Sequence, residues 1–226
     1  MATDTRARGK PHHFLNDAPP GKPMRRASTI VVVTWLAAAA PVSLAQSPDK
    51  AKARAIVDRL CVACHGVDGN SPQPAHPKLA GLQPEYLLKQ LRDYKKGLRK
   101  SDVMEPMVKE LTEDDMANLA AYYAEHKLKP GEARDAGLAE AGRKLYDDGI
   151  PDVGLPSCSG CHYPDGMGTP RFPRVAGQHA EYTYQQLKDF ASGKRENDRG
   201  LAMQSVANRM NDRQMKAVAE YVAGMK

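Results

Sequence analysis

Hydrophobic residues recur at helical spacing in several segments of the chain, and no segment shows the strict alternation expected of a strand. Two of the predicted helices begin at Thr112 and Asn211, because each can cap a helix and is followed three residues later by Asp115 or Gln214. The pattern predicts an all-α fold. The apolar faces of these two helices match position for position: Met116, Leu119, Ala120 and Tyr123 in one, and Met215, Val218, Ala219 and Val222 in the other.

The two matching helices close two copies of a longer internal repeat. Segment 61–99 aligns with segment 158–195, and each contains a pair of cysteines, a proline loop, a Glu-Tyr pair at the start of a helix and a Gly-x-Arg turn. A further helix is predicted ahead of each copy, at 49–60 and at 138–147. Each copy is therefore predicted to form a small helical domain of its own.

The chain is predicted to have three parts. Lys129-Pro130-Gly131-Glu132 predicts a linker, because proline and glycine just past a helix end stop the helix. We predict an N-terminal extension with a cleavable signal peptide over residues 1–45, a first domain over residues 46–130 and a second domain over residues 131–226.

Residues 24–45 have the three regions of an export signal. Two arginines form its positive start, residues 30–40 are apolar, and small residues precede a cleavage site that we predict after Ala45. The apolar run is shorter than the roughly 20 residues of a spanning helix, which makes an uncleaved anchor the weaker alternative. A start of translation at Met24 is a further alternative. Export predicts a periplasmic location.

The formal net charge of +6 comes mainly from this leader. Of the 33 basic and 27 acidic residues, six basic and two acidic ones lie in residues 1–45, which leaves a balance of +2 for the remainder. Aromatic residues make up only 6% of the chain, too few for a base-stacking surface. We therefore predict no nucleic-acid partner.

The four cysteines fall in two Cys-x-x-Cys-His motifs: Cys61, Cys64 and His65 in the first copy, and Cys158, Cys161 and His162 in the second. Two thiols at this spacing reach both vinyl groups of a haem, and the adjacent histidine then lies under the iron as an axial ligand. A redox disulfide and a four-cysteine zinc site are the alternatives. The strand-helix context of a redox disulfide is absent, and each cysteine pair has a complete copy of the repeat to itself. We predict two covalently bound c-type haems.

The second axial ligand of each iron is predicted to be a methionine. Met104 and Met203 occupy equivalent positions in the repeat, whereas Met107 aligns with Val206. The other matched methionines lie on the apolar face of the last helix of each copy and are assigned to the core. Histidine and methionine would saturate both irons, and methionine ligation raises the reduction potential.

Further haem contacts are predicted around these ligands. Pro77 and Pro173 lie in matching loops, and we predict that the carbonyl of each accepts a hydrogen bond from the non-ligating nitrogen of its histidine. A plain turn is the alternative for both prolines. Other matched residues are Leu79 and Val175, predicted on the haem face, and Tyr86, Tyr182, Arg99 and Arg195, predicted either at the propionates or at the surface.

The sequence resembles the cytochrome c4 family over about residues 48–226. This resemblance implies two tandem class-I cytochrome c domains related by a pseudo-twofold axis, with the propionate edges of their haems facing each other. It also implies electron transfer from a membrane quinol-oxidising complex or other donor to a terminal oxidase or other periplasmic acceptor. The motifs that carry it are Cys61-Val-Ala-Cys-His-Gly-Val-Asp-Gly-Asn, Pro77-Lys-Leu-Ala-Gly, Tyr86-Leu-Leu-Lys-Gln-Leu, Pro156-Ser-Cys-Ser-Gly-Cys-His and Gly177-Gln-His-Ala-Glu-Tyr.

One departure from the family concerns the helix ahead of each motif. Family domains often carry a glycine there that lets the last helix cross closely, and Gly142 fits this role in the second copy. The first copy has alanines at positions 51, 53 and 55 instead, which predicts a wider crossing in that copy.

The predicted function is that of a periplasmic electron carrier and not of an enzyme, because two saturated irons leave no position open for a substrate. One alternative is a catalytic or enzyme-subunit role, as in dihaem domains that partner a flavoprotein or in related dihaem enzymes that oxidise sulfur compounds. Another is a non-haem metal-binding module. A dihaem enzyme would be expected to replace an axial ligand or to carry a spare cysteine, and the sequence does neither. Peripheral contact with a membrane is compatible with the carrier.

Overall fold

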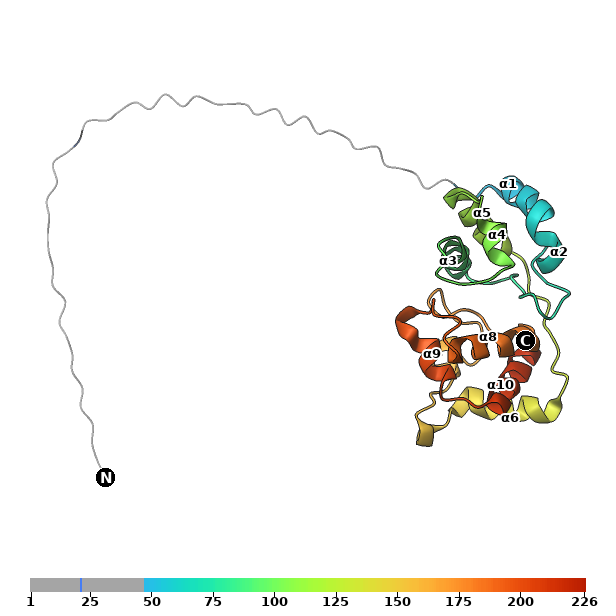
Figure 1. Cartoon of the computed structure of the whole chain (residues 1–226), viewed down its shortest axis with the longest axis vertical. Helices are drawn as coiled ribbons and strands as arrows, with labels where there is room; N and C mark the ends of the chain where they lie inside the picture. The colour runs from blue at the N-terminus through green and yellow to red at the C-terminus, as the bar shows by residue number, and fades with distance from the viewer. Residues whose placement is uncertain (1–20, 22–46) are drawn as a thin grey trace. The chain divides into compact units, whose positions relative to one another are not determined.

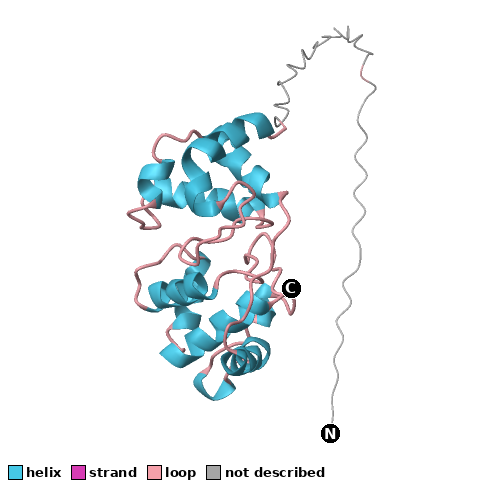
Figure 2. Cartoon of the chain, turned by 90° about the vertical axis from the view of Figure 1, so that its right-hand side faces the viewer, coloured by secondary structure: helices cyan, strands magenta, loops and turns pink. Residues whose placement is uncertain are grey.

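The computed structural model describes Gly21 and residues 47–226. The predicted export signal and its cleavage site after Ala45 lie outside the described residues. The described part folds into helices joined by loops, as Figure 2 shows, and its nearest approach to a strand is one bridge between Ile150 and Leu155. The predicted all-α fold is confirmed. None of these described helices is both long and apolar enough to cross a membrane.

The first half of the structure begins with a helix that runs directly into the first cysteine motif. α1 (Lys50–Ile56) continues through a π-helical turn, η1 (Val57–Cys61), into α2 (Val62–His65). The predicted helix at 49–60 therefore exists, but it does not end before the motif. The remaining helices of this half, labelled in Figure 1, are α3 (Pro84–Lys95), α4 (Met104–Val108) and α5 (Glu113–Ala124).

The second half repeats this order, with longer connections ahead of the motif helix and ahead of the helix that contains Met203. α6 (Ala136–Asp148) ends at Gly149, and a loop with the 3-10 turn η2 (Pro151–Val153) leads to α7 (Ser159–His162), the helix of the second motif. The predicted helix at 138–147 lies within α6. The rest of this half consists of α8 (Ala180–Ala191), the 3-10 turn η3 (Arg199–Leu201), α9 (Ala202–Ala207) and α10 (Asp212–Gly224).

Each half packs its helices around a separate hydrophobic core, and both halves belong to one compact unit. Met116 and Met215, the methionines assigned to the core, are 3% and 5% exposed. The predicted starts of the last helices are confirmed, because Thr112 and Asn211 each form a capping box. Other core residues are Val57, Leu119 and Tyr123 in the first half, and Tyr146, Leu187 and Val222 in the second.

The first and last helices of the second half cross so closely that a side chain at the crossing would clash. A Cβ atom on Gly142 of α6 would lie 2.0 Å from the carbonyl oxygen of Ala217 in α10. In the first half, α1 packs against α5 with Ala53 fully buried. The two halves therefore use different small residues in this helix.

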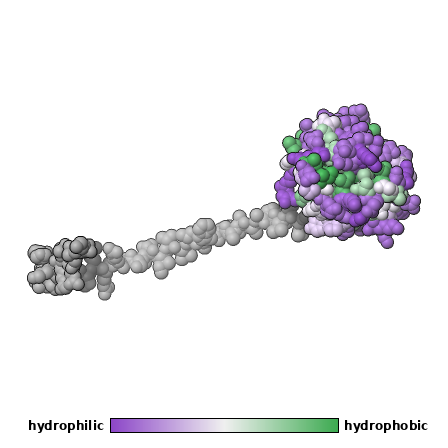
Figure 3. Space-filling view, turned by 90° about the horizontal axis from the view of Figure 1, so that it is seen from below, coloured by the Kyte–Doolittle hydropathy of each residue, from purple (hydrophilic) through white to green (hydrophobic). Residues whose placement is uncertain are grey.

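Some large apolar side chains stay exposed at the surface. Figure 3 shows hydrophilic residues over most of one face, with apolar residues gathered toward its middle. Leu98, Val103 and Leu201 are each more than half exposed, and all three lie shortly before Met104 or Met203. Exposed apolar side chains therefore lie shortly before both predicted methionine ligands in the sequence.

Candidate functional site

The first motif fixes its histidine at the end of α2. His65 is only 6% exposed, and its Nδ1 lies 3.0 Å from the carbonyl oxygen of Pro77. Because a carbonyl oxygen can only accept, Nδ1 must carry the proton, and Nε2 of the neutral ring keeps a free lone pair. This is the tautomer that a metal-ligating histidine needs when its other nitrogen binds a second partner.

The second motif repeats this arrangement at the end of α7. His162 is 8% exposed, and its Nδ1 lies 2.8 Å from the carbonyl oxygen of Pro173. Burial lowers the pKa of His65 and of His162, although the carbonyl contacts act in the opposite direction. Each proline carbonyl thus makes the contact expected from its sequence position, and its role beside a haem stays a prediction.

The residue after each histidine has the same unusual backbone conformation. Gly66 has φ 73° and ψ 160°, and Tyr163 has φ 67° and ψ 156°. A residue other than glycine is strained in this region. The carbonyl of Tyr163 accepts a 2.6 Å hydrogen bond from Oη of Tyr146, which helps to hold the strained turn. The turn ends the motif helix and begins the loop that leads to the proline.

None of the four cysteines is in a disulfide, so all four are available for the thioether bonds of a c-type haem. Burial raises the pKa of Cys61, and it raises that of Cys158 to about 11. Thiols with raised pKa values lack the thiolate character of a redox-active pair. Within the described residues, no three His, Cys, Asp or Glu side chains gather as a metal site, so zinc gains no support.

The two predicted methionine ligands are held in similar positions. Met104 begins α4 and Met203 lies in α9, and each is partly buried against the core of its own half. The N–H of Met104 donates to Oγ of Ser101 over 3.1 Å, and the N–H of Met203 donates to Oδ2 of Asp198 over 2.7 Å. Met107, the rival candidate, is 39% exposed. The ligand role of Met104 and Met203 stays a prediction.

The chemistry of the donor set in each half fits a c-type haem. Leu79 and Val175, the residues predicted on the haem face, are partly buried against their cores. Their N–H groups donate to equivalent glycine carbonyls, that of Gly69 over 2.7 Å and that of Gly166 over 2.8 Å. Each half therefore supplies two free thiols, a neutral histidine with an available Nε2, a methionine sulfur and an apolar side chain, as this haem requires.

The residues predicted at the propionates lie in one hydrogen-bond network between the halves. Arg99 donates to Oε1 of Gln90 in its own half over 2.7 Å and to Oη of Tyr182 in the other half over 2.9 Å. Arg195 donates to Oη of Tyr86 in the first half over 3.1 Å. The surface alternative is wrong for both arginines, which are 6% and 8% exposed. Their contact with propionates stays a prediction.

A second set of contacts joins the halves at the two proline loops, and the repeat did not predict it. The amide of Gln178 accepts from the N–H of Lys78 over 2.9 Å and donates to its carbonyl over 3.0 Å. Oε1 of Gln83 accepts from the N–H of Arg174 over 3.0 Å. Neither glutamine has a glutamine opposite it in the aligned repeat, so no matched pattern in the sequence could identify them.

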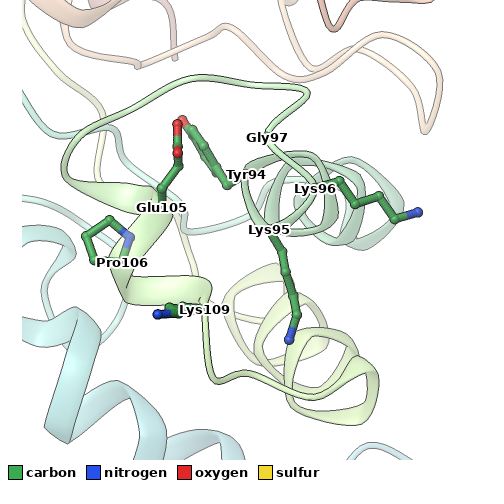
Figure 4. A pocket seen from close by; sticks show the side chains of 7 residues that line it. All are labelled: Tyr94, Lys95, Lys96, Gly97, Glu105, Pro106 and Lys109. Atoms are coloured by element: carbon green, nitrogen blue, oxygen red, sulfur yellow. The ribbon is translucent and has the colours of Figure 1, made fainter.

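An open pocket of about 460 Å³ lies between the end of α3 and α4, as the close-up in Figure 4 shows. Tyr94, Lys95, Glu105 and Lys109 contribute to its lining. None of the predicted cysteine, histidine or methionine ligands lines it, so this pocket is separate from the motifs.

The family model described as cytochrome c matches residues 50–127 and 139–226. The chain is 44% identical to cytochrome c4 of Thiocapsa roseopersicina over 83% of its length and 96% of the relative. It is 37% identical to the thiosulfate dehydrogenase electron acceptor of Thiomonas intermedia, over 89% of this chain and 91% of that relative.

Solved structures of the same two kinds of protein also resemble this chain. The structure of reduced recombinant cytochrome c4 from Pseudomonas stutzeri has a TM-score of 0.76 and 41% identity, covering 80% of this chain and 100% of that one. A thiosulfate dehydrogenase from Marichromatium purpuratum has a TM-score of 0.73 and 32% identity, covering 77% of this chain and 40% of that one.

Proposed function

The chain belongs to the cytochrome c family and, within it, to the dihaem cytochrome c4 proteins, and on this basis we propose that it is a periplasmic electron carrier. It has two tandem cytochrome c domains, and two covalently bound c-type haems are its cofactors. The proposed donor is a membrane quinol-oxidising complex or another redox protein. The proposed acceptor is a terminal oxidase or another periplasmic protein.

The site residues divide between attachment and ligation. In the first domain, Cys61 and Cys64 attach the haem, and His65 and Met104 are its axial ligands. In the second domain, Cys158 and Cys161 attach the haem, and His162 and Met203 are its axial ligands. The bound haem supplies a one-electron couple at its iron.

The observation that best supports the carrier function is the burial and the protonation of the two histidines. Both rings are buried, protonated on Nδ1 toward a proline carbonyl, and free to bind a metal through Nε2. A matched methionine, packed beside each core, supplies the second ligand. Two side-chain ligands on each iron favour electron transfer over substrate binding.

A second candidate is the electron-accepting subunit of a thiosulfate-oxidising enzyme. Its support is the 37% identity to the relative named thiosulfate dehydrogenase electron acceptor. The two candidates share the same haem chemistry and differ in the donor. Stopped-flow measurements of the reduction rate can separate them. Faster reduction by a purified thiosulfate dehydrogenase than by a quinol-oxidising complex would favour the subunit, and the reverse order would favour the respiratory carrier.

An optical redox titration of protein matured in a periplasm, recorded with and without carbon monoxide, tests the carrier function. Two low-spin haems at positive potential that do not bind carbon monoxide are the expected result. Carbon monoxide binding to either haem of the unaltered protein would contradict the proposal, since it requires an open iron.

A further inference from the structure

The peptide group between Pro77 and Lys78 is hydrogen-bonded at both ends. Its carbonyl oxygen accepts from Nδ1 of His65 over 3.0 Å, and its N–H donates to Oε1 of Gln178 over 2.9 Å. The histidine belongs to the first domain and the glutamine to the second. One planar peptide group therefore connects a predicted iron ligand of one domain to a side chain of the other.

The peptide group between Pro173 and Arg174 is used in the same way, with the domains exchanged. Its carbonyl oxygen accepts from Nδ1 of His162 over 2.8 Å, and its N–H donates to Oε1 of Gln83 over 3.0 Å. Both predicted histidine ligands are thus held by a peptide group that the opposite domain contacts.

The orientation of each glutamine amide is fixed by its other contacts. Oε1 of Gln178 also accepts from the N–H of His179 over 3.0 Å, and Nε2 of Gln178 donates to the carbonyl of Lys78 over 3.0 Å. Nε2 of Gln83 donates to the carbonyl of Met167 over 2.6 Å. Reversing either amide would place NH₂ against N–H donors, so the oxygen must face the peptide group.

We propose that each domain tunes the haem of the other domain through these peptide groups: Gln178 acts on His65, and Gln83 acts on His162. The inference rests on the proposed histidine ligation. A peptide that donates its N–H becomes a better acceptor at its carbonyl, and such chains strengthen each bond by about 10–30%. A stronger acceptor at Nδ1 makes the imidazole a more basic ligand. A more basic ligand stabilises the oxidised iron and lowers the reduction potential.

The tuning acts across the interface, and this distinguishes it from a contact that only holds the domains together. Loss of a structural contact would affect both haems, or mainly the domain that carries the substituted residue. Loss of Gln178 should instead raise the potential of the haem in the first domain, while loss of Gln83 should raise that of the second. The positioning residue and the affected haem lie in different domains.

The test uses the full, haem-loaded chain with Gln178→Leu and Gln83→Leu, and Gln185→Leu as the matched control. Gln185 is an exposed glutamine of α8 that bonds Asp189 within its own helix. Spectroelectrochemistry measures both potentials, and NMR contacts to Met104 or Met203 assign each haem. The expected result is a crossed pattern of upward shifts, with the Nδ1–H resonance of the affected histidine moving upfield and no shift for Gln185→Leu.

The variant Gln178→Glu covers the case in which leucine disturbs folding. It keeps an acceptor for the N–H of Lys78 and strengthens it, so the Nδ1–H resonance of His65 should move downfield and the first haem should become harder to reduce. Unchanged potentials and resonances in folded leucine variants, or shifts confined to the domain of the substitution, would overturn the tuning. Loss of histidine ligation in the unaltered protein would instead overturn the proposed function.

Discussion

The guanidinium of Arg99 in the first domain donates a 2.9 Å hydrogen bond to the hydroxyl of Tyr182 in the second domain. The equivalent residues exchange the reciprocal bond, from Arg195 to Tyr86 over 3.1 Å. Burial alone would raise the pKa of Tyr86, but the charges of Arg195 and Arg99 outweigh it and lower this pKa. The repeat therefore places matched residues on both sides of one interface, where each arginine is bonded to the partner domain.

Replacing Arg99 by methionine should destabilise this interface. Arg99 is 6% exposed and also donates to Oε1 of Gln186 over 2.7 Å. The substitution removes a buried charged donor and leaves the hydroxyl of Tyr182 without the bond it accepts, although Arg195 still donates to Gln186. We expect a loss of about 3 kcal/mol in the free energy of unfolding, measured in urea on the haem-loaded protein. Arg92→Met, which removes an exposed ion pair with Glu113, is the control and should cost less than about 1 kcal/mol. Equal losses in the two variants would contradict the role of Arg99.

Replacing Met104 by alanine should open the iron of the first domain while leaving the haem attached. The cysteines and His65 are untouched, so covalent attachment and one axial ligand remain. Carbon monoxide should then bind one haem of the two, and the potential of that haem should fall because methionine ligation raises it. Met107→Ala is the control, since Met107 is 39% exposed and aligns with Val206 in the second copy. An intact low-spin spectrum in Met104→Ala would exclude Met104 as the ligand.

Replacing Gly142 by alanine should destabilise the second domain severely. The added Cβ would lie 2.0 Å from the carbonyl oxygen of Ala217, and backbone atoms on both helices must move to relieve the clash. We expect a loss of about 3 kcal/mol by urea unfolding. Gly137→Ala in the same helix is the control. Its added Cβ would meet Oδ1 of Asp135 at 3.4 Å, so alanine should be neutral or slightly stabilising there.

Local patterns and the repeat predicted much of this structure. The capping residues Thr112 and Asn211 were identifiable because a helix start has a short sequence signature. Pro77 and Pro173 were identifiable because a missing N–H leaves only the carbonyl to act. The alignment of the two copies also separated Met104 from Met107.

Contacts between the domains could not be predicted in this way. Gln178 lies 100 residues from Lys78 along the chain, and no periodicity or motif relates the two. Gln83 and Gln178 act on equivalent peptide groups from positions that are not equivalent in the repeat. The π-helical turn at 57–61 was missed as well, because its residues have the same apolar spacing as an ordinary helix.

Lowering the pH should weaken the first domain before the second, because their capping boxes differ in one titratable residue. Asp115 completes the box of α5, whereas the uncharged Gln214 completes that of α10. The hydrogen bond from Lys52, and then that from the N–H of Thr112, lower the pKa of Asp115 to about 2 from its ordinary 3.8. A carboxylate with a lowered folded-state pKa contributes stability above its unfolded pKa and loses it as the pH falls through the folded value.

Between pH 4 and pH 2, the protection of amides against hydrogen exchange, relative to their intrinsic rates at each pH, should therefore fall more at the start of α5 than at the start of α10. The substitution Asp115→Gln makes the two boxes alike and should remove this difference. It should also make the free energy of unfolding depend less steeply on pH in acid, because one fewer proton is taken up on unfolding. It should also lower stability at pH 5, where the ionised carboxylate is still paired with Lys52 over 2.8 Å. A larger fall of protection in α10 than in α5, or an unchanged slope in Asp115→Gln, would show that the acid sensitivity originates elsewhere.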